Sequence, residues 1–226
     1  MSTEQMTPEN ESGTSRRWFL GAAAAVAAGG VLAACSSDDS AVDTGAGVST
    51  TVAGGASTTA AAAKEGGDAK VAALAAGLEV LAVGTYKAAL DAATANKLGA
   101  VPPAVATFAK TAMGHHQTAL DTWNKVLTGA GQPAVSAPPA SLKATVDAEF
   151  AKVKDVVGVA KLALLLEQTA ADTYLSATQT LTGKDALTTA GAFQIVDQEH
   201  AAILLFVLGE YPVPDVFQKT DKAFKG

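Results

Sequence analysis

Four long apolar segments of this chain each carry an acid or a histidine near the middle, and this pattern strongly constrains the fold. The polar centres are Glu79 in 71–86, His115 and His116 in 108–123, Glu167 in 162–171, and Asp197 to His200 in 186–208. Ionisable side chains are rarely buried unless they are paired or bind a metal ion. The pattern therefore indicates a cage of polar ligands in the core of a helical bundle.

Apolar residues after residue 67 recur at helical spacing, as in Leu74, Leu78 and Leu81, and glycine and proline residues separate the segments. The predicted helices are Asp68–Asn96, Pro103–Thr128, Asp155–Leu181 and Asp185–Leu208, with a short helix over 141–154. Asp68 is predicted to cap the first of them. Helices one and two are joined by a short connection, as are three and four, so each pair should be antiparallel. The predicted fold class is all-α, an antiparallel four-helix bundle with one long crossover between helices two and three.

The sequence also repeats itself in two halves. In each half an acid is followed seven residues later by a tyrosine, and then by a histidine in the next helix. The two sets are Glu79, Tyr86 and His116, and Glu167, Tyr174 and His200. Residues three, four or seven apart share a helix face, and small residues flank both acids, which leaves room for an ion. The repeat predicts a pseudo-twofold bundle with one central site, toward which Asp197 also points.

Residues 68–208 resemble the ferritin-like superfamily, and within it the secreted bacterial ferritin-like-domain proteins. The superfamily's metal site takes one Glu from each of two helices and a Glu-x-x-His from each of the other two. Glu79 and Glu167 match the single acids, while Asp197–His200 and Met113–His116 match the Glu-x-x-His motifs with Asp and Met in first place. The resemblance implies the metal ligands Glu79, His116, Glu167, Asp197 and His200, with Tyr86 and Tyr174 as hydrogen-bond donors around them.

Met113 is the main departure from the family pattern, because a thioether cannot replace a hard carboxylate toward Fe or Mn. The five remaining nitrogen and oxygen ligands suit one ion, or two with solvent completing the shell. Fe is the metal expected first, with Mn or Zn as alternatives, and with none bound if the site is degenerate. In that last case each acid is a protonated core residue bonded to a tyrosine, each histidine is satisfied by a carboxylate, and the tyrosines fill the core. Helical rotation places His115 and Glu199 on the flanks of their helices.

The first 35 residues predict an export signal and not a part of the fold. Arg16 and Arg17 precede an apolar run that ends in Leu32-Ala33-Ala34-Cys35, which resembles a twin-arginine signal followed by a lipobox. The run from Trp18 to Ala34 is short and poor in leucine, so a stable membrane span is not expected. Cys35, the only cysteine, is the expected lipidation site and would anchor the protein in the membrane on the outer face of the cell envelope.

Residues 36–67 are rich in Ser, Thr, Ala and Gly and lack apolar periodicity, so they are predicted to be a flexible tether. The remaining domain, 68–226, has 13 Lys and 15 acids without a basic patch, which argues against nucleic-acid binding. The leading hypothesis is an exported, lipid-anchored protein that binds Fe or another hard metal in the bundle core, with iron oxidation as a further activity. The alternative is a metal-free envelope lipoprotein that serves in interaction or stress protection. No catalytic residue is predicted, and protein partners are left open.

Overall fold

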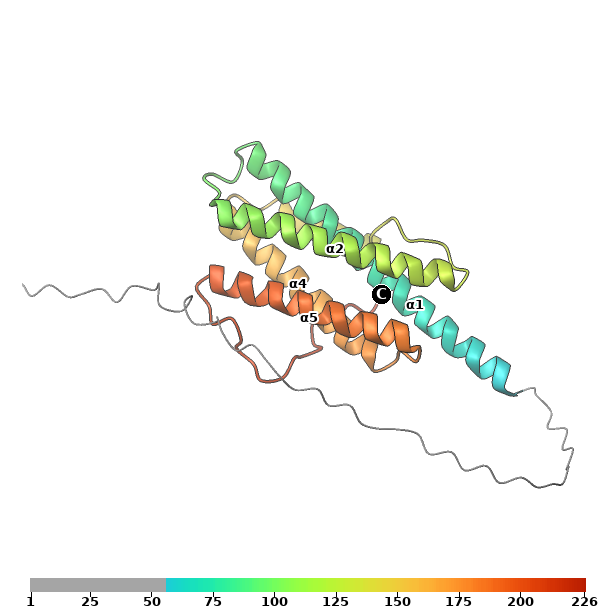
Figure 1. The fold of residues 1–226 in the computed structure, drawn as a ribbon. Helices are drawn as coiled ribbons and strands as arrows, with labels where there is room; N and C mark the ends of the chain where they lie inside the picture. The colour runs from blue at the N-terminus through green and yellow to red at the C-terminus, as the bar shows by residue number, and fades with distance from the viewer. Residues whose placement is uncertain (1–55) are drawn as a thin grey trace, which may run out of the picture. The chain divides into compact units, whose positions relative to one another are not determined.

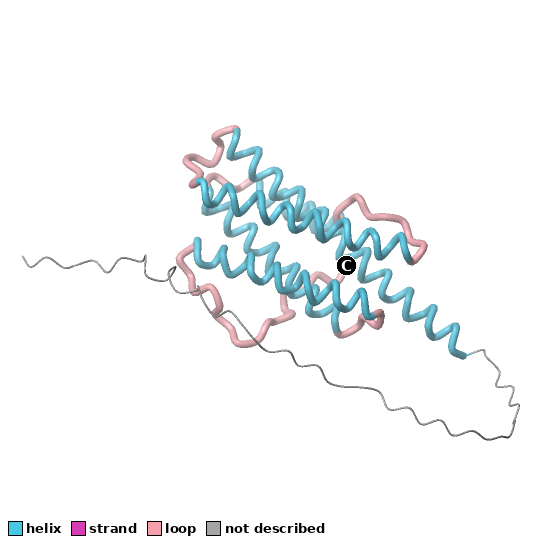
Figure 2. Tube along the Cα trace, viewed as in Figure 1, coloured by secondary structure: helices cyan, strands magenta, loops and turns pink. Residues whose placement is uncertain are grey.

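The structure of the protein is a computed structural model that describes residues 56–226. These residues form five helices and no strand (Figures 1 and 2). The helices are α1 (Ala56–Thr94), α2 (Pro103–Gly129), α3 (Ala140–Phe150), α4 (Val156–Thr178) and α5 (Lys184–Val207). The predicted all-α fold class is confirmed. The predicted export signal and lipidation site, with Arg16, Arg17 and Cys35, lie outside the described residues.

The four long helices form two pairs of neighbours. α1 packs against α2 and α4 packs against α5, while α1 meets α4 and α2 meets α5 between the pairs (Figure 1). The α1–α2 and α4–α5 connections are short, whereas the connection from α2 to α4 carries α3 and returns along the bundle (Figure 2). α1 and α4 therefore run in opposite directions, which decides how their polar side chains meet.

The helix limits lie close to the predicted ones except at the start of α1. The sequence predicts a start at Asp68, but α1 begins at Ala56, so the last part of the expected tether, 56–67, is helical. This stretch contains Ala60–Ala63, and alanine has the highest helix propensity of all residue types. The helix propensity of these alanines outweighs the low propensity of Gly66 and Gly67, which the sequence-based prediction assigned to the tether.

Asp68 does not cap α1 but binds the α4–α5 connection. Its carboxylate accepts hydrogen bonds from the backbone N–H groups of Thr182 at 3.0 Å and Gly183 at 2.6 Å. A Cβ atom on Gly183 would lie 2.8 Å from Asp68 Oδ2, so a larger residue would displace the carboxylate. Gly183 is the N-cap residue of α5 and offers no side-chain cap. Asp68 therefore stabilises the beginning of α5 from another helix.

Two apolar clusters fill the bundle at different levels along its length. The first contains Trp123, Leu127, Tyr174, Leu181 and several alanines of α1 and α5, and the second contains Tyr86, Ala112, Ala160, Ala163 and Leu204. Each of the four long helices contributes to both clusters. The polar residues singled out by sequence lie between members of the two clusters along each helix, so they form a polar layer between two apolar ones.

The part of α1 over Gly66–Thr94 is long and apolar enough to cross a membrane, and its most apolar 18 residues have a mean hydropathy of 1.4. Half of these 18 residues are buried inside the bundle. A helix at the centre of a packed domain meets the same criteria of length and composition. The burial shows that the apolar character of α1 serves the bundle core.

The segment after α5 packs along α4. The Gln218 side-chain amide and the Lys222 backbone N–H donate to the Asp172 carboxylate at 2.6 and 3.0 Å. The backbone N–H of Phe224 donates to Thr173 Oγ1 at 2.8 Å. Asp172 and Thr173 are buried, and a buried polar group without a partner is costly. The C-terminal segment therefore satisfies the polar groups of α4 that face it.

Candidate metal centre

The polar layer brings four potential metal ligands together. His116 of α2, Glu167 of α4, and Asp197 and His200 of α5 each offer a nitrogen or oxygen atom, and these atoms lie within 4.8 Å of one another. All four side chains are buried, as is Glu79 of α1 beside them. The five residues that the sequence predicts as ligands thus lie at one level of the bundle. We call them the cage.

Glu167 is at the centre of the cage. Its carboxylate lies 3.1 Å from His116 Nε2 and 3.2 Å from His200 Nδ1, and it accepts a hydrogen bond from the Tyr86 hydroxyl. Burial by itself raises the pKa of Glu167, but the charges and hydrogen bonds of His116 and His200 outweigh it and lower the pKa to about 2. Glu167 is therefore ionised, and its charge is shared by two imidazoles.

Glu79 binds the other side of the His116 ring. Its Oε2 lies 2.7 Å from His116 Nδ1, and its Oε1 accepts a hydrogen bond from the Tyr174 hydroxyl. Trp123 Nε1 in turn donates to that hydroxyl at 2.8 Å. Burial alone would lower the pKa of His116, but the carboxylates of Glu167 and Glu79 raise it well above its ordinary value. His116 is thus a charged imidazolium between two carboxylates.

The two tyrosines bind acids on the opposite helix. Tyr86 of α1 donates to Glu167 of α4, and Tyr174 of α4 donates to Glu79 of α1. Each tyrosine follows the acid of its own helix by seven residues, which is about two helical turns. Because α1 and α4 are antiparallel, equal spacing sets each tyrosine opposite the other helix's acid. The sequence repeat therefore corresponds to a reciprocal exchange of hydrogen bonds. Burial raises the pKa of both hydroxyls, so they remain donors.

Asp197 is the member of the cage with spare coordinating capacity. Its Oδ2 is buried and has no hydrogen-bond partner among residues 56–226, and its Oδ1 lies 4.0 Å from His116 Nδ1. Burial, followed by the nearby charge of Glu79, raises the pKa of Asp197 well above its ordinary value. An unpartnered buried carboxyl oxygen is rare in folded proteins. It is the ligand atom that a bound ion would satisfy.

The cage fits one first-row metal ion. Ligands about 2.1 Å from such an ion lie at most about 4.2 Å apart, so the four ligand atoms would need to contract by roughly half an ångström. A cavity of about 10 Å³ borders Glu79, His116 and Glu167, close to the volume needed for one water molecule. Two imidazoles and two carboxylates form the mixed donor set that suits Fe, Mn or Zn. Met113 is only partly buried and packs against the second apolar cluster.

His115 is the residue that sequence analysis missed. It was expected on a flank of its helix and is exposed, yet its Nδ1 lies 3.0 Å from His200 Nε2. The sequence contained a signal, because alanines stand three residues before and four after His115, on the same side of the helix. Both of them, Ala112 and Ala119, are buried. His115 therefore lies at the border of the buried face. The partial burial of its ring, followed by the neighbouring His200 and His116, lowers the pKa of His115. Glu199 is exposed, as its rotation predicted.

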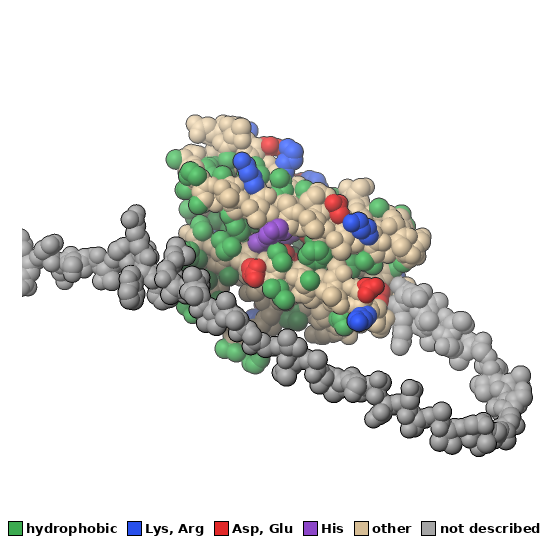
Figure 3. Space-filling view, in the orientation of Figure 1, with side chains coloured by type: hydrophobic (Ala, Val, Ile, Leu, Met, Phe, Trp, Pro, Cys, Tyr) green, Lys and Arg blue, Asp and Glu red, His purple; other side chains and the backbone are tan. Residues whose placement is uncertain are grey.

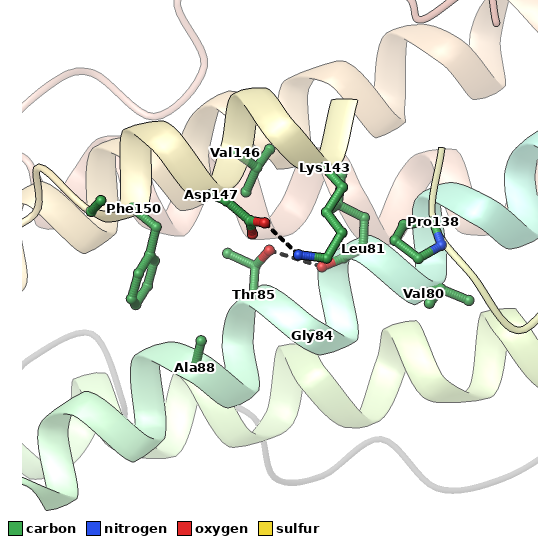
Figure 4. Close-up of a pocket in the computed structure, with 11 residues that line it drawn as sticks. Val80, Leu81, Gly84, Thr85, Ala88, Pro138, Lys143, Val146, Asp147 and Phe150 are labelled. Atoms are coloured by element: carbon green, nitrogen blue, oxygen red, sulfur yellow. Dashed lines mark hydrogen bonds and ion pairs between the residues drawn. The ribbon is translucent and has the colours of Figure 1, made fainter. Parts of the chain in front are cut away.

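A groove between α1 and α3 lies apart from the cage. It has a volume of about 420 Å³ and is lined mostly by apolar side chains, among them Leu81, Val146 and Phe150 (Figure 4). Its one carboxylate, Asp147, forms an ion pair with Lys143 on the same helix. The groove therefore offers no cluster of ligands comparable to the cage.

Comparison with known proteins agrees with the geometry. The family model described as "Ferritin-like domain" matches residues 67–210. The matched residues include all four long helices of the bundle, except the first turns of α1, and every member of the cage. Among curated proteins, none matches this sequence.

Proposed function

The chain belongs to the ferritin-like domain family, and from this premise we propose that it binds Fe, or Mn or Zn in its place, in the bundle core. The observation that supports this most directly is the buried group of two imidazoles and two carboxylates within 4.8 Å. The unpartnered Oδ2 of Asp197 supports it further, because a buried oxygen of this kind lacks a structural reason in the metal-free protein.

Each ligand atom in the proposal follows from the hydrogen bonds of the cage. His116 would coordinate through Nε2, which would give up its proton and its contact with Glu167, while Nδ1 keeps its bond to Glu79. His200 would coordinate through Nδ1, which faces Glu167. Glu79 then keeps the His116 ring in place, as carboxylates do for many metal-bound histidines. The tyrosine donors Tyr86 and Tyr174 hold the two glutamates. If these residues hold Fe, the ion would supply an Fe(II)/Fe(III) couple, and iron oxidation is the activity we propose.

Metal loading of the full-length protein tests the proposal. After separate loading with Fe(II), Mn(II) and Zn(II) and removal of excess ion, we expect about one ion per chain for at least one of them, measured by elemental analysis. A metal that binds only the folded state stabilises it, by about 2.7 kcal/mol at a hundred times the dissociation constant. A chelator should therefore lower Tm of the loaded protein and leave that of the metal-free protein unchanged. Absence of metal in all three samples, with no chelator effect, would contradict the proposal.

A metal-free bundle is the second candidate, and the hydrogen bonds of the cage favour it. His116, Glu79, Glu167 and both tyrosines already satisfy one another in the metal-free structure. Met113 also occupies the position of a family carboxylate. If the loading experiment finds no metal, we propose that the protein acts in the envelope as an interaction or stress-protection module.

We also propose that the protein is exported and held to the outer face of the membrane by lipidated Cys35. The support is the order of Arg16, Arg17, the apolar run and Cys35 in the sequence. Replacing both arginines by lysine should leave precursor in the cytoplasm, as measured by fractionation and immunoblotting. Cys35→Ala should release the exported protein from the membrane fraction, whereas Ser40→Ala in the same stretch should leave it there. Normal export of the double lysine variant would refute the twin-arginine assignment.

A further inference from the structure

His115 and His200 form a pair of imidazoles that runs from the surface to the cage. His115 is exposed, whereas His200 is buried, and Figure 3 shows histidine on this face of the molecule with an acidic side chain near it. His115 Nδ1 lies 3.0 Å from His200 Nε2, and His200 Nδ1 lies 3.2 Å from Glu167 Oε2. The His200 ring therefore has one nitrogen toward the cage and the other toward the exposed histidine.

The two rings lie edge to edge. Their planes are 8° from parallel and their centroids are 5.2 Å apart, while the facing nitrogens are 3.0 Å apart. The centroid separation exceeds the nitrogen separation by about two ring radii, so the nitrogens point at each other and the rings do not lie face to face. The lone pair of an imidazole nitrogen lies in the ring plane, and a hydrogen bond or a metal ion approaches it there. Both nitrogens are thus aimed at the same point.

We propose that His115 and His200 Nε2 form an outer metal site, which takes up a divalent cation from solvent before the cation moves to the cage. This inference rests on the proposed metal binding in the core. The ion takes the place of the proton between the two facing nitrogens. This proton is lost to solvent while the exposed Nε2 of His115 takes one up from solvent, so both rings remain neutral ligands. Two nitrogens at about 2.1 Å from a tetrahedrally coordinated ion are about 3.4 Å apart, so the observed 3.0 Å needs to widen only slightly.

The shared ring explains why the outer site is transient. His200 belongs to both sites, through Nε2 outside and Nδ1 inside, so occupation of the cage places a second cation directly behind the outer one. Two cations joined by one imidazole repel each other, and the outer site has only two protein ligands against four in the cage. The outer site should therefore affect the rate of uptake and leave the final number of ions at about one.

Stopped-flow mixing of metal-free, full-length protein with Co(II) alone tests the outer site through the visible absorption of bound cobalt. His115→Ala should load about tenfold more slowly, which is the size of effect that loss of a partner of a metal ligand has on metal affinity or activity. The final absorption should match that of the wild type. Gln117→Ala is the matched control, because Gln117 is an exposed residue of α2 bonded to Asp121, and it should load at the wild-type rate.

Two further variants separate metal binding from simple support of the His200 ring. His115→Gln keeps a hydrogen-bond acceptor but is a weak metal ligand, so it should load as slowly as His115→Ala. His115→Glu provides a carboxylate ligand and should restore most of the rate. Wild-type rates in the Ala or Gln variant would overturn the outer site while leaving the cage intact. If the wild type itself takes up no Co(II), Fe(II), Mn(II) or Zn(II), the proposed function fails, and the outer site fails with it.

Discussion

Replacing Glu167 by Gln is expected to lower the free energy of unfolding of the metal-free protein by about 3 kcal/mol and to abolish metal binding in the cage. The substitution keeps the volume of the side chain but removes the carboxylate charge that faces His116 and His200. Removal of one partner of a buried charge pair lowers the free energy of unfolding by about 3–5 kcal/mol. For a protein of this size, Tm should fall by roughly 10 °C, as measured by thermal unfolding followed by circular dichroism.

Glu149→Gln is the matched control for this change. Glu149 pairs with Lys152 at 2.7 Å on an exposed face, and exposed ion pairs contribute about 0–1 kcal/mol. The control should therefore keep both its stability and its metal content. Equal unfolding free energies for the two variants would show that the carboxylate of Glu167 does not carry the charge on which the cage depends.

The pH dependence of the free energy of unfolding provides a second comparison, between the wild type and Glu167→Gln. The pKa of Glu167 is lowered to about 2 in the folded protein, against about 4.3 for an unperturbed Glu. A group whose folded pKa is lowered stabilises the protein above its unfolded pKa and loses this effect as pH falls toward the folded pKa. The metal-free wild type should accordingly exceed Glu167→Gln in free energy of unfolding by the full amount above about pH 5. This difference should shrink as pH falls to about 2.

The polar layer was predictable because helical periodicity reports angular position. Glu79 and Glu167 each stand alone in an apolar segment, and His116, Asp197 and His200 lie in short polar groups inside apolar segments. An ionisable group can be buried in such a segment only if it is paired or bound. The equal spacing of acid and tyrosine in the two halves also predicted the tyrosines as donors. What it did not predict is their exchange between α1 and α4, which depends on the antiparallel direction of these helices.

Contacts between residues on different helices were beyond the sequence patterns. His115 was assigned to a flank, and it is exposed, but periodicity within α2 does not show that α5 places His200 within 3.0 Å of it. Asp68 was predicted as a cap for its own helix and instead binds the backbone of the α4–α5 connection. In both cases a local rule gave the exposure or the chemistry of the residue correctly but did not identify its partner, because the partner is set by tertiary packing.

The position of Glu79 distinguishes it from the other predicted ligands. The family pattern makes it equivalent to Glu167, but the group of atoms within 4.8 Å contains Glu167 and not Glu79. Glu79 is bonded to His116 Nδ1 and to Tyr174 instead. A second ion would need Glu79 to coordinate and would need a further carboxylate on α2. That carboxylate is the one that Met113 replaces.

Met113→Glu is therefore expected to raise the metal content from about one ion to about two per chain. Glu at this position restores Glu-x-x-His with His116, and residues three apart share a helix face. The same change should destabilise the metal-free protein, because Met113 packs in an apolar cluster with Tyr86 and Leu204 and a carboxylate there is costly without a partner. Metal loading should reverse this loss, so Tm of the variant should depend more on metal than that of the wild type.

Met113→Leu is the control, since a swap between apolar residues of similar volume costs less than about 1.5 kcal/mol and adds no ligand. It should bind about one ion, with a chelator effect equal to that of the wild type. Elemental analysis and thermal unfolding with and without Fe(II) distinguish the three proteins, and oxygen consumption on addition of Fe(II) should be faster for Met113→Glu. A Met113→Glu protein that holds no more metal than Met113→Leu would show that this bundle positions one ion only. The wild-type methionine would then be an apolar residue beside a mononuclear site, and not the replacement of a ligand in a dinuclear one.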